Sequence, residues 1–243
     1  MKKLVLGFVL FLLSAVAMAQ DSLVMSKIIY YNGKGIIFPT AWLAKKVNAK
    51  ATAADIEKFS QDTAAVITAF NKYPSRILKE ELGLVYIIGR LRFGGQYFTG
   101  TNSAENIYIA SEANSEIEKT FHHEFSSILL RKYSDILFEM KWKAESPELR
   151  SGSSAAAVKA GLYSIGFDEK LLEKGYLSSY SLSNWENDFN MYAENIFAGG
   201  RAFWKIADSH PKVLGKTRMI IKFYGEKIWS GFTENFFRLG ADE

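Results

Sequence analysis

The sequence of 243 residues contains no cysteine, so no disulfide can form and the fold must rest on packing, with or without a bound metal. A run of basic residues is also missing. The formal charge of +4 includes Lys2 and Lys3 close to the N-terminus. Such a mild excess of positive charge without a cluster argues against nucleic acid as a partner.

Motifs of several enzyme classes are missing as well. Neither Gly33-Lys34-Gly35 nor Gly94-Gly95 stands between a strand and a helix, where a glycine loop that cradles phosphate belongs. Nothing else in the sequence suggests a nucleotide, a flavin or a haem. The Gly-x-Ser-x-Gly elbow of serine hydrolases is absent too.

The first nineteen residues have the pattern of a cleavable signal peptide. Lys2 and Lys3 precede an apolar stretch, Leu4–Val16, and Ala17-Met18-Ala19 supplies the small residues that signal peptidase recognises. The stretch is too short for a membrane span, and no cysteine is near for lipoprotein processing. We expect residues 1–19 to be removed and the mature protein to be secreted or periplasmic, with no membrane attachment.

The remaining chain predicts one α+β domain over residues 20–243. About 220 residues is a size typical of one domain with a sizeable core. The pattern predicts a small sheet beside several helices, because short β-branched runs in the first half give way to helical periodicity from Ser115. The expected elements are an arm or a short strand pair within 21–50, a helix capped by Thr52–Asp55 and ending near Lys72, strands at 84–88, 96–98 and 106–110, a long helix from Ser115 past Met140, a polar excursion over 144–183, and helices over 185–208 and 212–237.

The segment His123-Glu124-Phe125-Ser126-Ser127 matches part of a zinc motif. In a His-Glu-x-x-His helix the two imidazoles share one face and bind one zinc, while the glutamate polarises the bound water. His123 and Glu124 are in register, but Ser127 stands at the second histidine position. A serine hydroxyl stays protonated near neutral pH and is a poor ligand. His122 points about a hundred degrees away from His123 on a helix.

Three segments together resemble the zinc-binding metallopeptidases of the gluzincin type, including the lethal-factor-like branch. They are Phe121–Leu129, Gly175–Tyr180 and Ser183–Glu194, the last similar to the Ser-Asn-x-x-Glu-Asp-Phe-Ala-Glu-like segment of that family. The resemblance covers roughly Pro74 to the C-terminus. It implies a zincin-like domain, in which a small sheet packs on a long motif helix and the C-terminal half is helical.

The resemblance also implies roles for individual residues. Zinc would be bound by His123 and by an acidic residue of the later helix, for which we favour Glu186 and keep Glu194 as the second choice. Asn187 occupies the position at which the family has its glutamate ligand. Glu124 would be the general base, and Tyr180 would stabilise an oxyanion or serve as a packed aromatic. The other positions to be tested as ligands are His122 and Ser127, whereas His210 is expected at the surface in a turn.

Three functions remain open at this point. The first is a zinc-dependent peptidase that hydrolyses a peptide or protein substrate, which the retained His123-Glu124 pair favours. The second is a peptidase-like fold that has lost catalysis and serves as a binding or accessory protein, which Ser127 favours. The third is a non-peptidase binding domain in which the His-Glu pair is incidental.

Overall fold

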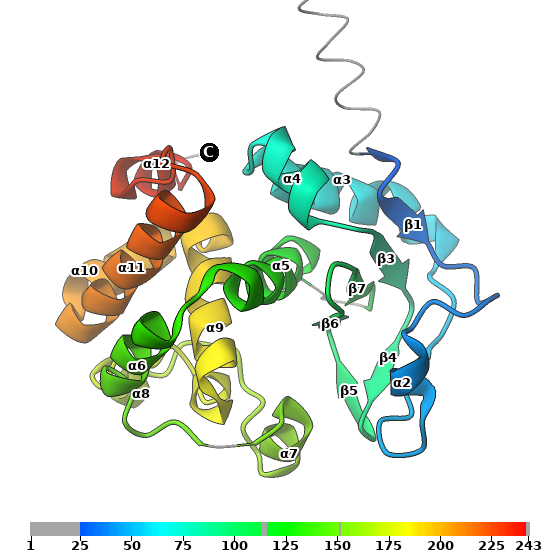
Figure 1. Cartoon of the computed structure of the whole chain (residues 1–243), viewed down its shortest axis with the longest axis horizontal. Helices are drawn as coiled ribbons and strands as arrows, with labels where there is room; N and C mark the ends of the chain where they lie inside the picture. The colour runs from blue at the N-terminus through cyan, green and yellow to red at the C-terminus, as the bar shows by residue number, and fades with distance from the viewer. Residues whose placement is uncertain (1–24, 113–115, 151, 242–243) are drawn as a thin grey trace, which may run out of the picture.

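A computed structural model describes residues 25–112, 116–150 and 152–241 (Figure 1). The predicted signal peptide lies outside these ranges. None of the helices within them combines the length and the apolar character that crossing a membrane requires.

The first sheet has four strands in the order β1-β3-β7-β6, with β6 antiparallel to β7 and the other pairs parallel. Its central strands are apolar and almost wholly buried, as is typical of parallel strands covered on both faces. The strands are β1 (Ile28–Tyr30), β3 (Val85–Ile88), β6 (Gly100–Asn102) and β7 (Ile107–Ala110).

A second, antiparallel sheet has the order β2-β4-β5, from β2 (Lys50–Ala51), β4 (Leu91–Phe93) and β5 (Gln96–Phe98). The hairpin between β4 and β5 turns at Gly94-Gly95, where φ is +58° and +85°. Two successive residues with positive φ suit the tight hairpin turn that glycine favours.

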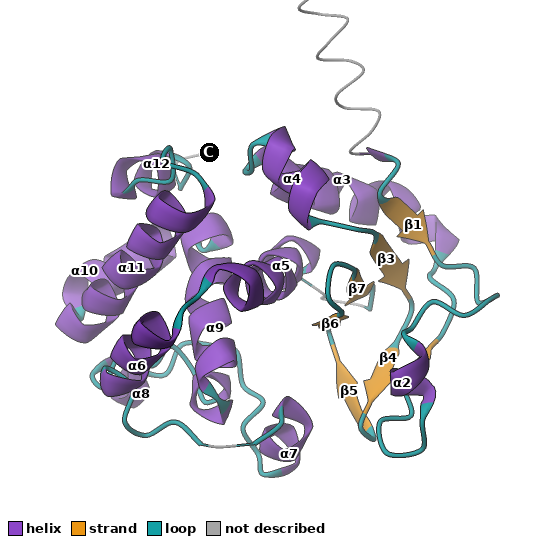
Figure 2. Cartoon of the chain, in the orientation of Figure 1, coloured by secondary structure: helices purple, strands orange, loops and turns teal. Residues whose placement is uncertain are grey.

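Helices, joined by loops, make up the rest of the regular structure in the described chain (Figure 2). The motif helix α5 lies at the centre, against α3, β6 and β7 on one side and against α9 on the other. Its residues Phe121, Phe125 and Leu129 are buried in the main core. The helices are α2 (Thr40–Leu43), α3 (Phe59–Asn71), α4 (Ser75–Glu81), α5 (Ile117–Tyr133), α6 (Ile136–Ala144), α7 (Ser154–Lys159), α8 (Glu169–Leu172), α9 (Trp185–Ala198), α10 (Gly200–Ser209), α11 (Pro211–Phe223) and α12 (Glu234–Leu239).

The predicted α+β architecture is confirmed, with small sheets and a largely helical C-terminal half. The strands expected at 84–88, 96–98 and 106–110 are present as β3, β5 and β7. Of the two alternatives expected for 21–50, the strand pair is wrong, because β1 and β2 join different sheets.

The prediction of one helix from Ser115 past Met140 is wrong. The chain leaves helical geometry at Ser134, and Asp135 caps α6 by accepting a hydrogen bond from the Phe138 amide. Three apolar side chains that fitted the helical period then point to solvent: Ile136, Leu137 and Met140 are 67%, 63% and 61% exposed.

Other helix boundaries differ for local reasons. Asp55, not Thr52, caps the single 3₁₀ turn that precedes α3, by accepting from the Glu57 amide. The helix predicted over 185–208 divides into α9 and α10 at Gly199 and Gly200, the latter with φ +58°. The residues after Pro74 form a further helix, α4, before the chain reaches β3.

The contact between β6 and α5 depends on the absence of a side chain at Gly100. A Cβ there would lie 2.5 Å from Thr120 Cγ2 and 2.9 Å from Glu124 Oε1. We expect Gly100→Ala to lower the free energy of unfolding by about 1–3 kcal/mol, because β6 must move away from α5. Urea denaturation would measure the change.

Gly215→Ala is the matched control for this substitution. Gly215 lies within α11, and a Cβ added there meets no atom within 4 Å. Alanine should therefore raise stability by roughly 0.5–1 kcal/mol through helix propensity and a less flexible unfolded chain. Equal effects at the two positions would contradict the proposed close contact at Gly100.

Candidate functional site

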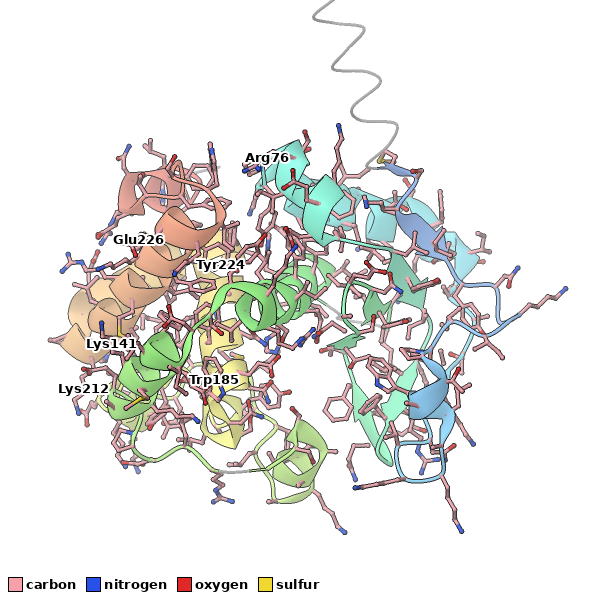
Figure 3. The ribbon with its side chains drawn as sticks, in the orientation of Figure 1. Arg76, Lys141, Trp185, Lys212, Tyr224 and Glu226 are labelled. Carbon is pink, nitrogen blue, oxygen red and sulfur yellow. The ribbon has the colours of Figure 1, made fainter. Side chains whose placement is uncertain are left out.

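A cleft of about 1140 Å³ lies along one face of the motif helix. Helix α5 and the start of α9 contribute one side, β6 and the β4–β5 hairpin contribute the other, and α7 with the segment before it closes one end. Trp185, at the first position of α9, is one of its lining residues (Figure 3).

Helix α5 turns four polar side chains toward this cleft: His123, Glu124, Ser127 and Arg131. Positions 123, 127 and 131 are four residues apart, so they lie along one face of the helix. This is the face on which the sequence predicts metal ligands.

That face is paired, residue by residue, with helix α9. His123 Nδ1 lies 2.9 Å from Glu194 Oε2, and Ser127 Oγ accepts a hydrogen bond of 2.6 Å from Asn190 Nδ2. The third pair is an ion pair of 3.0 Å from the Arg131 guanidinium to Glu186. From one pair to the next, the residue number rises by four on α5 and falls by four on α9, so the two helices run antiparallel along these contacts. We call these three contacts the α5–α9 pairs.

The first pair is a charge-assisted contact in a nearly closed environment. The side chains of His123 and Glu194 are 12% and 9% exposed. Burial disfavours a charged imidazole, but the hydrogen bond and the charge of Glu194 outweigh it and raise the pKa of His123. The charges of Glu124 and Glu186 act in the same direction. These interactions favour the protonated imidazole of His123 as the partner of the Glu194 carboxylate.

Glu124 lies beside this pair and is oriented by β6. The amide of Asn102 donates a hydrogen bond to its carboxylate. Burial raises the pKa of Glu124, although the neighbouring His123 and the bond from Asn102 oppose that rise. A carboxyl group of raised pKa next to an imidazole is suited to accepting or donating a proton.

Tyr180 lies across the cleft from the motif, at the start of the 3₁₀ helix Tyr180–Ser183. Its ring centroid is 5.9 Å from that of His123. Burial, and next the charge of Glu124, raise the pKa of Tyr180 well above its ordinary value. The phenol therefore stays protonated and can donate a hydrogen bond to a ligand in the cleft.

His122 faces the core instead of the cleft. Its side chain is fully buried, its Nδ1 lies 3.0 Å from the hydroxyl of Tyr73, and its ring stacks on Phe197 at 4.7 Å. Glu118 lies 3.7 Å from its other nitrogen and is paired with Lys72 at 2.5 Å. Burial, the largest influence, lowers the pKa of His122 to about 4. The sequence predicts that His122 points away from His123, and its position in the core agrees with this prediction.

The buried His122 predicts acid sensitivity. An unfolded histidine titrates near pH 6.5, so between about pH 6.5 and 4 only the unfolded chain binds this proton, and stability falls as pH falls. We expect His122 to account for a loss of about 2 kcal/mol between pH 7 and pH 5. In His122→Phe, which keeps a ring stacked on Phe197, the loss of unfolding free energy between pH 7 and pH 5 should be smaller by that amount. Urea denaturation at both pH values measures this loss. A loss equal to that of the wild type would contradict the buried position of His122.

Of the remaining residues predicted from the sequence, Glu194 contacts His123, whereas Glu186, Asn187 and His210 have other partners. Glu186 is engaged by Arg131, and Asn187 donates to Ser183 Oγ at 2.7 Å. His210 contacts Glu169 in the turn before α11, at 3.1 Å. Glu194, the second choice from sequence, is the carboxylate that meets His123. The catalytic and metal-binding roles assigned from the sequence stay predictions.

Sequence reasoning missed three residues of this site: Asn102, Arg131 and Asn190. A signal existed for Arg131, which continues the spacing of His123 and Ser127 by a further four residues. It existed for Asn190 as well, four residues before Glu194. Asn102 had no such signal, because only the tertiary fold brings β6 to α5.

The donor set does not fit a catalytic zinc, which takes three protein ligands and keeps one open position. Over the described ranges, no three His, Cys, Asp or Glu side chains are grouped so that they could hold a metal. Ser127, at the second helical ligand position, is 4% exposed and held by Asn190. The potential zinc ligands that contact each other here are one histidine, His123, and one glutamate, Glu194.

The chain has an α+β fold whose motif helix lines the cleft, and a comparison with known structures agrees on the fold. No protein-family model and no curated protein matches the sequence. Among solved structures, the chain is similar to a crystal structure from Bacteroides caccae described as a "putative zinc-binding metallo-peptidase". The TM-score is 0.52 at 12% identity, over 92% of this chain and 90% of that one. At this identity the likeness shows the fold alone.

Proposed function

We propose that this protein is an exported member of the gluzincin-like group that binds a polypeptide in its cleft and has lost zinc-dependent hydrolysis. Support comes from the fold, which is similar to that of a putative zinc-binding metallopeptidase, and from the cleft that the motif helix lines. The residues along the motif face serve instead to join α5 to α9. The protein would act as a binding or accessory protein outside the cytoplasm.

The observation that carries this proposal is the set of α5–α9 pairs. A zincin site needs imidazoles at both 123 and 127 and a free carboxylate opposite them. Here Ser127 is bonded to Asn190, and Glu186 neutralises Arg131. Three direct contacts thus use the side chains that would otherwise surround a metal.

Export is supported by the N-terminal pattern. Lys2 and Lys3, the apolar stretch and Ala17-Met18-Ala19 are the three parts of a signal peptide. Expression of the full chain in a bacterial host, followed by N-terminal sequencing of the periplasmic product, would test it. A product that begins at Gln20 is expected, and full-length protein retained in the cytoplasm would contradict export.

A second function, zinc-dependent peptide hydrolysis, is favoured by one specific observation. His123, Glu124 and Tyr180 all line the same cleft, and Glu194 lies directly behind His123. If zinc were bound, it would supply a Lewis acid and an activated water. His123 and Glu194 would be its protein donors, Glu124 would accept a proton, and Tyr180 would donate a hydrogen bond.

Incubation of the mature protein with a mixed peptide library, with zinc added, separates the two functions. We expect no cleavage above that of buffer, as followed by mass spectrometry. Cleavage that is abolished both by a chelator and by Glu124→Gln would overturn the binding function in favour of the peptidase. Cleavage that survives Glu124→Gln would indicate a contaminating protease, which repurification would remove.

A further inference from the structure

Basic side chains outnumber acidic ones around the cleft. Five lysines and arginines line it against two glutamates, an excess of three. The formal charge of the whole sequence is only +4. A cleft lined mainly by charges of one sign attracts ligands of the opposite sign and raises their rate of association. The five basic residues are Lys46, Arg131, Lys143, Arg150 and Lys159.

Three of these cations have no carboxylate partner in the parts of the chain that the structure describes. They are Lys46, Arg150 and Lys159, all with exposed side chains. The other two, Arg131 and Lys143, each form an ion pair with a glutamate of the chain. Unpaired cations that line a cleft remain available to a ligand.

Neither glutamate of the cleft forms an ion pair with these three cations in the described structure. Glu186 is paired with Arg131, and the carboxylate of Glu124 accepts a hydrogen bond from Asn102. Both carboxylates lie on the motif side of the cleft. The positive charge on the rest of the lining is therefore uncompensated within the described chain.

The three cations come from segments far apart in sequence. Lys46 follows α2, Arg150 follows α6, and Lys159 ends α7. The lining also includes aromatic side chains, among them Phe93 and Phe98 from the β4–β5 hairpin. A cleft that presents both cations and aromatic rings suits a chain that carries both carboxylates and apolar side chains, because each kind of group finds its partner.

We propose that the cleft binds an acidic polypeptide segment, whose carboxylates pair with Lys46, Arg150 and Lys159 while its apolar side chains pack on the aromatic lining. The inference rests on the proposed function in that the cleft is the binding site. It names the class of partner and does not depend on a metal.

Binding of two labelled peptides of equal length to the mature protein tests the charge preference. One peptide alternates glutamate with phenylalanine and glycine, and the other has lysine in place of each glutamate. Fluorescence anisotropy should give a Kd at least about tenfold lower for the acidic peptide at low salt, and the difference should shrink as salt screens the exposed cations. Equal affinities for the two peptides would overturn the proposal.

Removal of the three cations tests the assignment to residues. Lys46→Gln/Arg150→Gln/Lys159→Gln should weaken binding of the acidic peptide about tenfold, as expected from three exposed ion pairs. Lys34→Gln/Lys79→Gln/Lys205→Gln alters the net charge equally at exposed positions that do not line the cleft. It should leave the Kd within about twofold. A cleft variant that keeps full affinity, or a control that loses as much, would overturn the proposal, and urea denaturation verifies that both variants fold.

Three further outcomes separate this inference from the proposed function. Tight binding of a sulfated polysaccharide by a protein that ignores the acidic peptide would overturn the polypeptide class. Zinc-dependent cleavage of the acidic peptide would overturn the non-catalytic function and leave the ligand class intact. Failure of the acidic peptide to bind a metal-free, inactive protein would overturn the ligand class alone.

Discussion

A Lys216→Met variant should lose about 3–5 kcal/mol of unfolding free energy, because it leaves the buried carboxylate of Asp188 without its counter-ion. Lys216 and Asp188 are 1% and 0% exposed and form a direct ion pair. For a chain of this size the loss corresponds to a fall in Tm of about 10 °C. Urea denaturation followed by tryptophan fluorescence would measure it.

The surroundings explain why this pair should have so large an effect. The ammonium group lies 4.8–4.9 Å from three ring centroids, those of Trp142, Tyr176 and Tyr192. It also donates to a backbone carbonyl at 2.8 Å, while Asp188 accepts from the Trp142 indole at 2.9 Å. Water has no access to either charge, so loss of one partner cannot be offset by solvation.

A double variant is the control for this prediction. Lys216→Met/Asp188→Asn removes both charges and keeps an acceptor for the Trp142 indole, so it should recover at least half of the lost stability. A Lys216→Met variant that loses less than about 1 kcal/mol would contradict a tightly paired buried charge. So would a double variant whose loss equals the sum of the losses in Lys216→Met alone and Asp188→Asn alone.

A Ser127→His/Asn190→Ala variant should bind zinc at least about a hundredfold more tightly than the wild type. The new imidazole lies one helical turn from His123 on the same face, and removal of the Asn190 amide provides the room that it needs. With Glu194 opposite, three protein donors of the right kind would then meet. Isothermal titration with zinc chloride would measure the affinity and should give one site per chain.

The matched control adds His123→Ala to the same variant. It should abolish the gain, because zinc would again have too few donors. If the engineered chain bound zinc no better than the wild type, the motif helix would not be oriented as described. If the wild type already bound with the affinity of the engineered chain, the missing histidine would not be the feature that limits the site.

How much of this molecule the sequence predicts depends on the range of the interaction. The buried strand 84–88 and the motif helix follow from local patterns, a short apolar run between glycines and a helical period. The break before Asp135 had a local signal too, since aspartate is a favoured N-cap. The apolar spacing of Ile136 and Met140 masked that signal, because periodicity alone does not reveal which positions a neighbour covers.

The site itself is harder to predict, because it depends on how two helices meet. Spacing places His123, Ser127 and Arg131 on one face of α5 but says nothing of the register of α9 against it. Only that register decides that Glu194, and not Glu186, faces His123. The positive lining of the cleft is a tertiary property for the same reason, since Lys46 and Lys159 belong to separate segments.

The most direct test of the central claim is the metal content of the purified protein, expressed without residues 1–19. The protein would be incubated with equimolar zinc, dialysed against metal-free buffer and measured by elemental analysis beside His123→Ala and Glu194→Ala. The α5–α9 pairs predict far less than one zinc per chain in all three proteins. One zinc per chain in the wild type, lost in both variants, would contradict the account and establish a metal centre at this site.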